Sequence, residues 1–366
     1  MTRELDAIAL AERVLSILEE GSFSATYRFA LFTALLDLCI EQTSRQGAAP
    51  TTITTRQLAE KVTELYWNQS VPYENHGTLR QGGVRDTSQA EVVRRIAQSR
   101  LTWADSRTET PFRAHLTHPR EFRRLLDFVE WKLIEMPIPR LQVLGGQEDR
   151  FLYEYHWTQN ICQSTVSAYQ RGRGSTFDNR LLLRPGVGEQ LVRLNGVLRP
   201  LFHREWALMV ASLNRLPQAD LETFLFGAER VSLDAVREPL TNLQDGRCFY
   251  CDRRVQERPD VDHFVPWSRF PDDGLDNLVV AHAACNGSKR DFMAAAEHVE
   301  RWRRRMVEQG PSLAALASQA GWRRDDTRTL SVARALYLRL PDTVRLWRAP
   351  SHFIPLERNR IERALV

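Results

Sequence analysis

The chain has 366 residues and a formal net charge of +4, with hydrophobic residues making up 43% and charged residues 26%. These fractions are typical of a globular protein with a sizeable core, and so mild a charge does not by itself indicate nucleic-acid binding. No apolar run approaches the roughly 18 residues of a membrane span, and the first residues lack the apolar stretch of a signal peptide. We therefore expect a cytoplasmic protein with no membrane partner.

The cysteines are unevenly placed, since three of the five lie between residues 248 and 285. This distribution favours a metal site in a reducing compartment over a disulfide framework. We expect the other two, Cys39 and Cys162, to be buried thiols. Lysine occurs only at positions 61, 132 and 289 among many arginines. That bias is usual in proteins from G+C-rich genomes, so the lysine at 289 is by itself a weak functional signal.

Apolar residues at helical spacing dominate the first part of the chain. They predict one or two helices in residues 5–42, with a break at residues 21–24. They also predict a helix that is capped by Thr54 and runs to about Trp67. This helix starts like the first helix of many helix-turn-helix domains. It either belongs to a DNA-reading domain or is an ordinary packed helix, and we favour packing.

Further helices are predicted at residues 87–107, 119–135, 187–214, 220–243 and 292–308, with a strand at 151–157. A basic face on the helix at 87–107, made of Arg94, Arg95, Arg100 and Arg107, either follows a phosphate backbone or is simply solvated. Arg171 and Arg173 lie in a Gly-containing loop that allows the same two interpretations. Solvent exposure without a ligand is the favoured interpretation for both.

Two pairs of metal-binding residues share one spacing. Cys248 and Cys251 form the first pair, and His282 and Cys285 form the second. Four thiolate or imidazole ligands complete a tetrahedral site and leave no position open for a substrate. One pair alone would suit a redox pair or buried cysteines, but two pairs flanking a polar segment indicate a structural Cys3His site for Zn2+. The ion would tie together a segment too short for a core of its own.

Between these pairs, Asp262 and His263 lie side by side on a predicted short strand, residues 261–266. Neighbours on a strand point to opposite faces, so we expect no bond between them. One can hold a hard divalent cation while the other takes a proton from water. Phosphodiester hydrolysis requires this division of labour.

A helix is predicted to follow the second pair, with Asn286 at its start. Asn286 can add an amide-oxygen ligand for the cation, and the N-terminus of the helix favours an anionic phosphate. Lys289 and Arg290 are expected in the first turn, where they would meet phosphate oxygens.

These residues together carry a family resemblance. The strings Asp-His-x-x-Pro-x-Ser from residue 262, Asp-Asn-Leu from residue 276 and Cys-Asn-x-x-Lys from residue 285 resemble the HNH endonucleases, also called ββα-metal or His-Me finger nucleases. The resemblance is confined to residues 246–291. It implies that His263 is the general base, that Asp262 binds the catalytic metal, and that Asn277 braces the loop orienting the histidine.

Asn286 stands where many members of that family have a final histidine, so the chain resembles an HNN variant. Asparagine is also found there in the HNH domain of CRISPR effector nucleases, where it binds magnesium. The resemblance therefore implies Mg2+ or Mn2+ rather than zinc at the catalytic position. His282 stands where a cysteine is usual, and imidazole is a competent zinc ligand in its place.

The predicted fold class is mainly α with a small α+β part. Residues 1–240 form a helical accessory region for targeting, oligomerisation or regulation, with two subdomains if it divides near 140–150. Residues 241–310 form the ββα-metal finger, and residues 311–366 form an Arg-rich helical tail.

The expected function is a metal-dependent endonuclease acting on DNA, with double-stranded DNA favoured, in restriction or anti-phage defence. Partners would be a second copy of the chain or another protein of a defence system. A zinc-stapled nucleic-acid-binding module with vestigial catalysis and an RNA-directed nuclease are the alternatives. Trp267, Arg269 and Phe270, in the loop after the strand, either help to hold DNA or pack within that loop.

Overall fold

The computed structural model describes residues 6–19, 25–83, 88–103, 110–158, 160–217, 221–227 and 232–366. The chain forms two compact units, one made of Met1–Cys39 with Pro50–Arg230 and the other of Ile40–Ala49 with Val231–Val366. This division differs from the three parts predicted. Residues 311–366 fall in the same unit as residues 241–310, and the division near residue 230 lies about ten residues before the predicted boundary.

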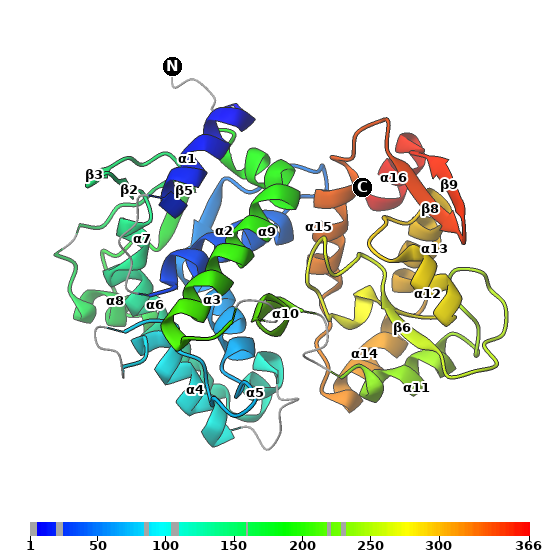
Figure 1. Cartoon of the computed structure of the whole chain (residues 1–366), viewed down its shortest axis with the longest axis horizontal. Helices are drawn as coiled ribbons and strands as arrows, with labels where there is room; N and C mark the ends of the chain where they lie inside the picture. Colours follow the sequence, from blue (N-terminus) through cyan, green and yellow to red (C-terminus); the bar gives the residue numbers. More distant parts are fainter. Residues whose placement is uncertain are drawn as a thin grey trace. The chain divides into compact units, whose positions relative to one another are not determined.

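Helices make up most of the first unit (Figure 1). They are α1 (Ala7–Glu19), α2 (Tyr27–Glu41, whose last two residues belong to the second unit), α3 (Thr55–Gln69), α4 (Glu91–Trp103), α5 (Pro111–Thr117), α6 (Pro119–Glu135), α7 (Pro137–Arg140), α8 (Gln163–Gln170), α9 (Val187–Asn214) and α10 (Leu221–Phe226). The strands are β1 (Thr52–Thr54), β2 (Val143–Leu144), β3 (Gln147–Glu148), β4 (Tyr153–Glu154) and β5 (Arg180–Leu183). β1, β5 and β4 form an antiparallel sheet in that order, and β2 pairs with β3.

The core of the first unit forms where α2, which is apolar on nearly all sides, packs on α9. The rings of Phe32 and Phe202 stack with their centroids 3.9 Å apart. Nearby, Thr54 caps α3 in a capping box with Gln57, as the threonine at this position predicted. The predicted bounds of α6 and α9 are confirmed.

α4 follows α3 only after residues 70–90, and a helix-turn-helix requires a turn of about 3–4 residues, so the two helices do not form one. α3 instead packs on α6, in agreement with the favoured interpretation. Two predictions for this unit are wrong. The strand predicted at 151–157 is only Tyr153–Glu154. Cys162 is exposed, whereas Cys39 is buried as predicted. The predicted break at 21–24 lies outside the described residues, as does the end of the predicted 87–107 helix.

The second unit contains a ββα element and the helices around it. Its elements are α11 (Asp234–Leu243), β6 (Asp260–His263), the 3-10 helix η2 (Leu275–Asn277), β7 (Leu278–Ala281), α12 (Ala283–Lys289), α13 (Ala296–Glu308), α14 (Gly310–Ala320), α15 (Asp326–Tyr337), β8 (Arg345–Ala349), β9 (His352–Pro355) and α16 (Arg358–Leu365). Its apolar core joins α11, β7 and α14 through residues that include Leu240, Val280 and Leu313. The mainly helical fold with a small α+β part is confirmed.

The tail contains a hairpin that the sequence analysis missed. β8 and β9 pair antiparallel, with Trp347 opposite Phe353. The backbone of Trp347 also bonds to Met293 and Ala295, with N···O distances of 2.9 and 2.8 Å. These bonds hold residues 293–295 extended, which is why α13 begins at Ala296 rather than at Phe292.

Among the described residues, no helix combines the length and the apolar character needed to cross a bilayer.

Candidate metal centre and active site

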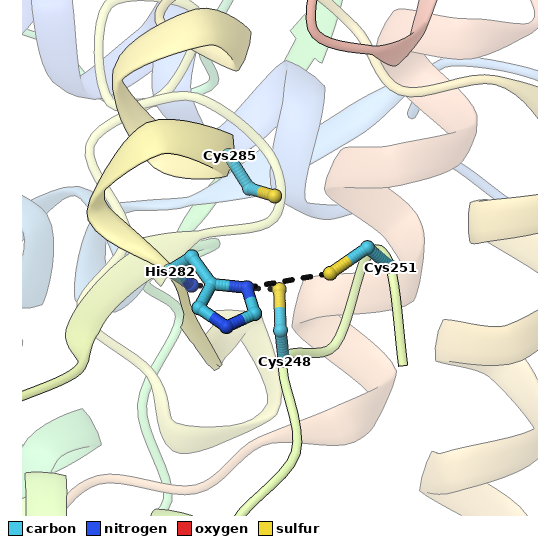
Figure 2. Close-up of side chains that lie close together, drawn as sticks. All are labelled: Cys248, Cys251, His282 and Cys285. Atoms are coloured by element: carbon cyan, nitrogen blue, oxygen red, sulfur yellow. Dashed lines mark hydrogen bonds between the residues drawn. The ribbon is translucent and has the colours of Figure 1, made fainter. Parts of the chain in front are cut away.

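The four predicted zinc ligands converge on one point. Cys248 and Cys251 lie in the turn after α11, His282 precedes the first residue of α12, and Cys285 lies within that helix. Their ligand atoms all lie within 4.8 Å of one another, and Figure 2 shows the three sulfurs and the imidazole turned toward a common centre. Cys251 Sγ lies 3.3 Å from His282 Nδ1. The cluster fits a tetrahedral Zn2+ with no open position.

The surroundings of this cluster also suit a cation. His282 Nε2 lies 3.1 Å from the carbonyl oxygen of Arg254, an arrangement that leaves Nδ1 as the metal-binding nitrogen. Burial, followed by the neighbouring Cys248 and Cys251, raises the pKa of Cys285 to about 12. The pKa of Cys251 in the same cluster is lowered, although burial opposes that shift, because the backbone of Arg253 and the side chains of Cys248, His282 and Cys285 form hydrogen bonds with it. A divalent cation between the thiols would favour their ionised form.

β6 and β7 form the two strands of the ββα element, and α12 packs against β6. Asp262 pairs with Val279 across the ladder, and His263 pairs with Leu278. The side chains of Asp262 and His263 bond to different partners and not to each other, as alternation along a strand predicted.

His263 bonds to a carboxylate that the sequence analysis did not single out. Its Nε2 lies 2.8 Å from Oδ1 of Asp273. The ring lies beside Trp267, with centroids 5.3 Å apart. His263 as a whole is buried, with 9% of its surface exposed.

Asp262 is held by two donors. Its Oδ2 accepts a hydrogen bond from the hydroxyl of Tyr250 at 2.5 Å and lies 3.0 Å from Lys289 Nζ. Tyr250 lies between Cys248 and Cys251 of the Cys3His cluster in the chain, so the turn that carries these two cysteines also reaches the strand that carries His263.

Lys289 is not where the sequence analysis placed it. α12 begins at Ala283, so Lys289 is its last residue, and the predicted first-turn position is wrong. The side chain is fully buried, and Nζ donates to the carbonyl oxygen of His263 at 2.8 Å as well as pairing with Asp262. Burial lowers the pKa of Lys289, while Asp262 opposes that shift. In this position Nζ cannot meet a phosphate. Arg290, which follows the helix, is exposed.

Asn286 and Asn277 have separate environments. Asn286 lies in the middle of α12 rather than at its start, and its Nδ2 donates to Asp260 Oδ2 at 3.1 Å. Asn277 is fully buried. Its Oδ1 accepts from the amide of Val265 at 2.8 Å, and its Nδ2 donates to the carbonyl oxygen of Asp272 at 3.0 Å. Asn277 therefore joins the segment after His263 to the loop before β7.

Residues 248–295 match the model of the HNH endonuclease family. The chain carries an HNH endonuclease domain. No curated protein matches the chain. The matched segment contains both strands, α12 and the four residues of the Cys3His cluster, and it ends where α13 begins.

Side chains outside the matched segment hold the loop of the HNH domain that contains Asp272 and Asp273. Arg328, from α15, pairs with the buried carboxylate of Asp272 and also with Glu41, at 2.6 Å. The indole of Trp322 donates to the carbonyl oxygen of Asp273 at 2.7 Å. Neither Arg328 nor Trp322 was identified from the sequence, because nothing local to either residue signals which loop it contacts.

Further contacts to this loop come from α13. Arg305 is buried and donates to the carbonyl oxygens of Leu278 and Leu275 at 2.7 and 3.2 Å. Burial lowers the pKa of Arg305 to about 10, with Asp276 opposing the shift. The indole of Trp302 donates to the carbonyl oxygen of Asp276 at 2.8 Å. The HNH domain therefore depends on helices beyond its own family segment.

The residues around Asp262 offer oxygen donors of the kind that a hard cation prefers. Asp260 and Asp262 lie two residues apart on β6 and so share a face of the strand, and Asn286 reaches Asp260 from α12. Within the described ranges, the Cys3His cluster is the one group of three or more His, Cys, Asp and Glu side chains placed to hold a metal. The donor chemistry fits Mg2+ or Mn2+.

The loop after β6 is only partly available for contact with a ligand. Phe270 is fully buried, so it packs within the loop. Trp267 is half-buried and Arg269 is exposed. Of the three loop residues singled out in the sequence, these two have surface that a nucleic acid could reach.

Proposed function

We propose that the protein is a metal-dependent DNA endonuclease that hydrolyses phosphodiester bonds with a single catalytic metal ion. The main support is the environment of His263 in the HNH domain. The imidazole bonds to protein through Nε2, and Nδ1 makes no hydrogen bond within the described residues and is not among their buried unpartnered atoms. Water can therefore reach a ring nitrogen that is able to accept a proton.

Asp262 and Asn286 are the proposed ligands of the catalytic Mg2+ or Mn2+. A divalent ion bound there would polarise the phosphate and stabilise the charge on the leaving oxygen. The protein's part is to fix the donors. Tyr250 and Lys289 hold one carboxylate oxygen of Asp262, so they set the orientation of the other. Lys289 is therefore proposed as a positioning residue and not as a phosphate contact.

His263 is the proposed general base, and it would take a proton from the attacking water. Asn277 would brace the loop that follows the histidine, through its bonds to Val265 and Asp272. By family resemblance the products would carry a 5′ phosphate and a 3′ hydroxyl. The Cys3His cluster would hold Zn2+ for a purely structural purpose, since four protein ligands leave no open position.

The biological setting is proposed by analogy with other HNH proteins that carry large accessory regions. Double-stranded DNA is the proposed substrate, in restriction or anti-phage defence in the cytoplasm. The first unit would target, oligomerise or regulate the nuclease, acting on a second copy or on a partner protein of a defence system. An RNA-directed nuclease and a zinc-stapled binding module with vestigial catalysis are the competing proposals.

The decisive experiment is cleavage of plasmid DNA by the purified protein with Mg2+, Mn2+ or EDTA, alongside the His263→Ala variant. We expect metal-dependent cutting that falls at least about 100-fold in the variant, because a general base typically contributes that much. Matched DNA and RNA duplexes and single strands would identify the substrate class. Binding of DNA without cleavage under any of these conditions would favour the vestigial module.

A further inference from the structure

We propose that Asp273 is a positioning residue that fixes the ring orientation and the tautomer of His263. This inference rests on the proposed nuclease function for its catalytic consequence. The contact itself, 2.8 Å between Asp273 Oδ1 and His263 Nε2, does not depend on that function.

The chemistry of the two groups determines the tautomer. An ionised carboxylate only accepts hydrogen bonds, so the proton of a neutral imidazole must lie on Nε2 to make this contact. Nδ1 is then left with its lone pair, and it is the ring nitrogen without a protein partner in the described structure. Asp273 therefore selects the nitrogen that can act as the base.

The carboxylate is held firmly in place by its backbone. The carbonyl oxygen of Asp273 accepts a hydrogen bond from the indole of Trp322 at 2.7 Å. The preceding residue, Asp272, is fixed by its ion pair with Arg328 and by the bond between its carbonyl oxygen and Asn277. The residue before Asp273 and the carbonyl group of Asp273 itself are therefore both anchored, and its side chain bonds to His263.

Within the described residues, no lysine or arginine side chain pairs with the Asp273 carboxylate and so explains its orientation. His263 is the one ionisable side chain that bonds to the Asp273 carboxylate within the described part of the chain. The two side chains are mostly buried, with 11% of His263 and 24% of Asp273 exposed. A partly buried carboxylate that bonds only to an imidazole is suited to orienting it and to stabilising the imidazolium as it forms.

In the reaction, water would lose a proton to Nδ1 while its oxygen forms a bond to phosphorus and the bond from phosphorus to the 3′ oxygen breaks. The departing 3′ oxygen would take a proton from solvent water and so become the 3′ hydroxyl. The ring would then carry protons on both nitrogens, and Nε2–H would still donate to Asp273. Without the carboxylate the ring is free to turn or to protonate on Nδ1, and in that tautomer the nitrogen facing water cannot accept a proton.

The test compares Asp273→Leu, Asp273→Glu and Asp291→Asn with the wild-type full-length chain. Leucine has no atom that can accept a hydrogen bond, so Nε2–H loses its partner and the ring is no longer held in one orientation and one tautomer. We expect Asp273→Leu to lower kcat by about 10-fold or more with KM for DNA nearly unchanged, and Asp273→Glu, which can still accept from Nε2–H, to recover part of that loss. Asp291 is exposed and accepts a hydrogen bond from Ser268, which an asparagine can still do. Asp291→Asn therefore removes a charge near the site, and its kcat should stay within about threefold of the wild-type value.

Nitrogen-15 NMR of the histidine rings gives a second readout that needs no cleavage. The signals of His263, identified by their loss in His263→Ala, should report a proton on Nε2 alone in the wild type and a mixture of the two neutral tautomers in Asp273→Leu. A ring protonated on Nε2 alone in Asp273→Leu would overturn the inference, and so would a kcat equal to that of the wild type. If the wild-type protein cleaves nothing while the tautomer changes as expected, the nuclease proposal fails and the positioning role stands.

Discussion

The two ends of the HNH domain are built in different ways. At the zinc end, four ligands with simple spacing converge within 4.8 Å. At the other end, Asp262, His263 and Asn286 are each held by a protein partner, which is Lys289, Asp273 and Asp260 respectively. A structural metal site is specified by its ligands, whereas a catalytic site also requires the residues that orient them.

The largest loss of stability should come from a substitution in the Cys3His cluster. Cys248→Ser deletes a buried ligand, so we expect loss of bound zinc and a fall in unfolding free energy of at least several kcal/mol, since structural zinc contributes on the order of 10 kcal/mol in zinc-finger peptides. Cleavage should be lost as well, because Tyr250 lies in the same turn and holds Asp262. Zinc content and thermal melting measure the change.

The matched control for this variant is Cys162→Ser. Cys162 is an exposed cysteine of the first unit, so its variant should keep the zinc and the melting temperature of the wild type. Should Cys248→Ser also keep both, the structural assignment of the cluster would be wrong.

A smaller effect is expected at the catalytic end from Lys289→Met. The substitution preserves much of the side-chain volume but leaves the Asp262 carboxylate buried with Tyr250 as its remaining donor. Breaking one partner of a buried ion pair typically costs about 3–5 kcal/mol of unfolding free energy. Urea unfolding of the full chain measures this loss.

Lys132→Met is the matched control, because Lys132 forms its ion pairs with Glu91 and Glu135 at the surface. Such exposed pairs contribute about 1 kcal/mol or less. If Lys289→Met instead weakened only DNA affinity and left stability unchanged, the lysine would be a phosphate contact, as the sequence pattern first suggested.

The smallest of these effects concerns the loop that carries Asp273. Burial would raise the pKa of Asp272, but the Arg328 and Arg323 guanidinium groups outweigh it and hold that pKa below its ordinary value of 3.8. A carboxyl whose pKa is depressed on folding stabilises the protein above its unfolded pKa, and the contribution is lost as the pH falls through the folded value. Asp272→Asn should therefore lower the free energy of unfolding by about 2 kcal/mol at pH 7. The difference in unfolding free energy between the variant and the wild type should become smaller below about pH 4.

Urea unfolding of both proteins between pH 7 and pH 3.5 tests this expectation. Asp342→Asn is the control, because Asp342 pairs with Arg358 but is 84% exposed at its side chain. If the loss of unfolding free energy in Asp272→Asn were the same at every pH, the packing of the Asp272 side chain and not its charge would hold the loop.

Part of the fold could be predicted from local patterns. The cap at Thr54 and the bounds of α6 and α9 follow from capping residues and apolar periodicity, which act within one helix. The β8–β9 hairpin could not be predicted in the same way. Its strands are short, and one of them is held by backbone bonds between Trp347 and residues near 294, far away in the chain.

The sequence by itself determined the HNH motif, the four residues of the Cys3His cluster and the different partners of the Asp262 and His263 side chains. Each depends on spacing along a short segment, and chain geometry fixes what such spacing can do. The tertiary structure alone decided that Lys289 is buried against Asp262, that Asp273 bonds to His263, and that α13 and α15 hold the active-site loop. Burial and pairing of charged groups depend on segments that are distant in the chain. Local sequence patterns do not indicate which of these segments will be in contact in the folded protein.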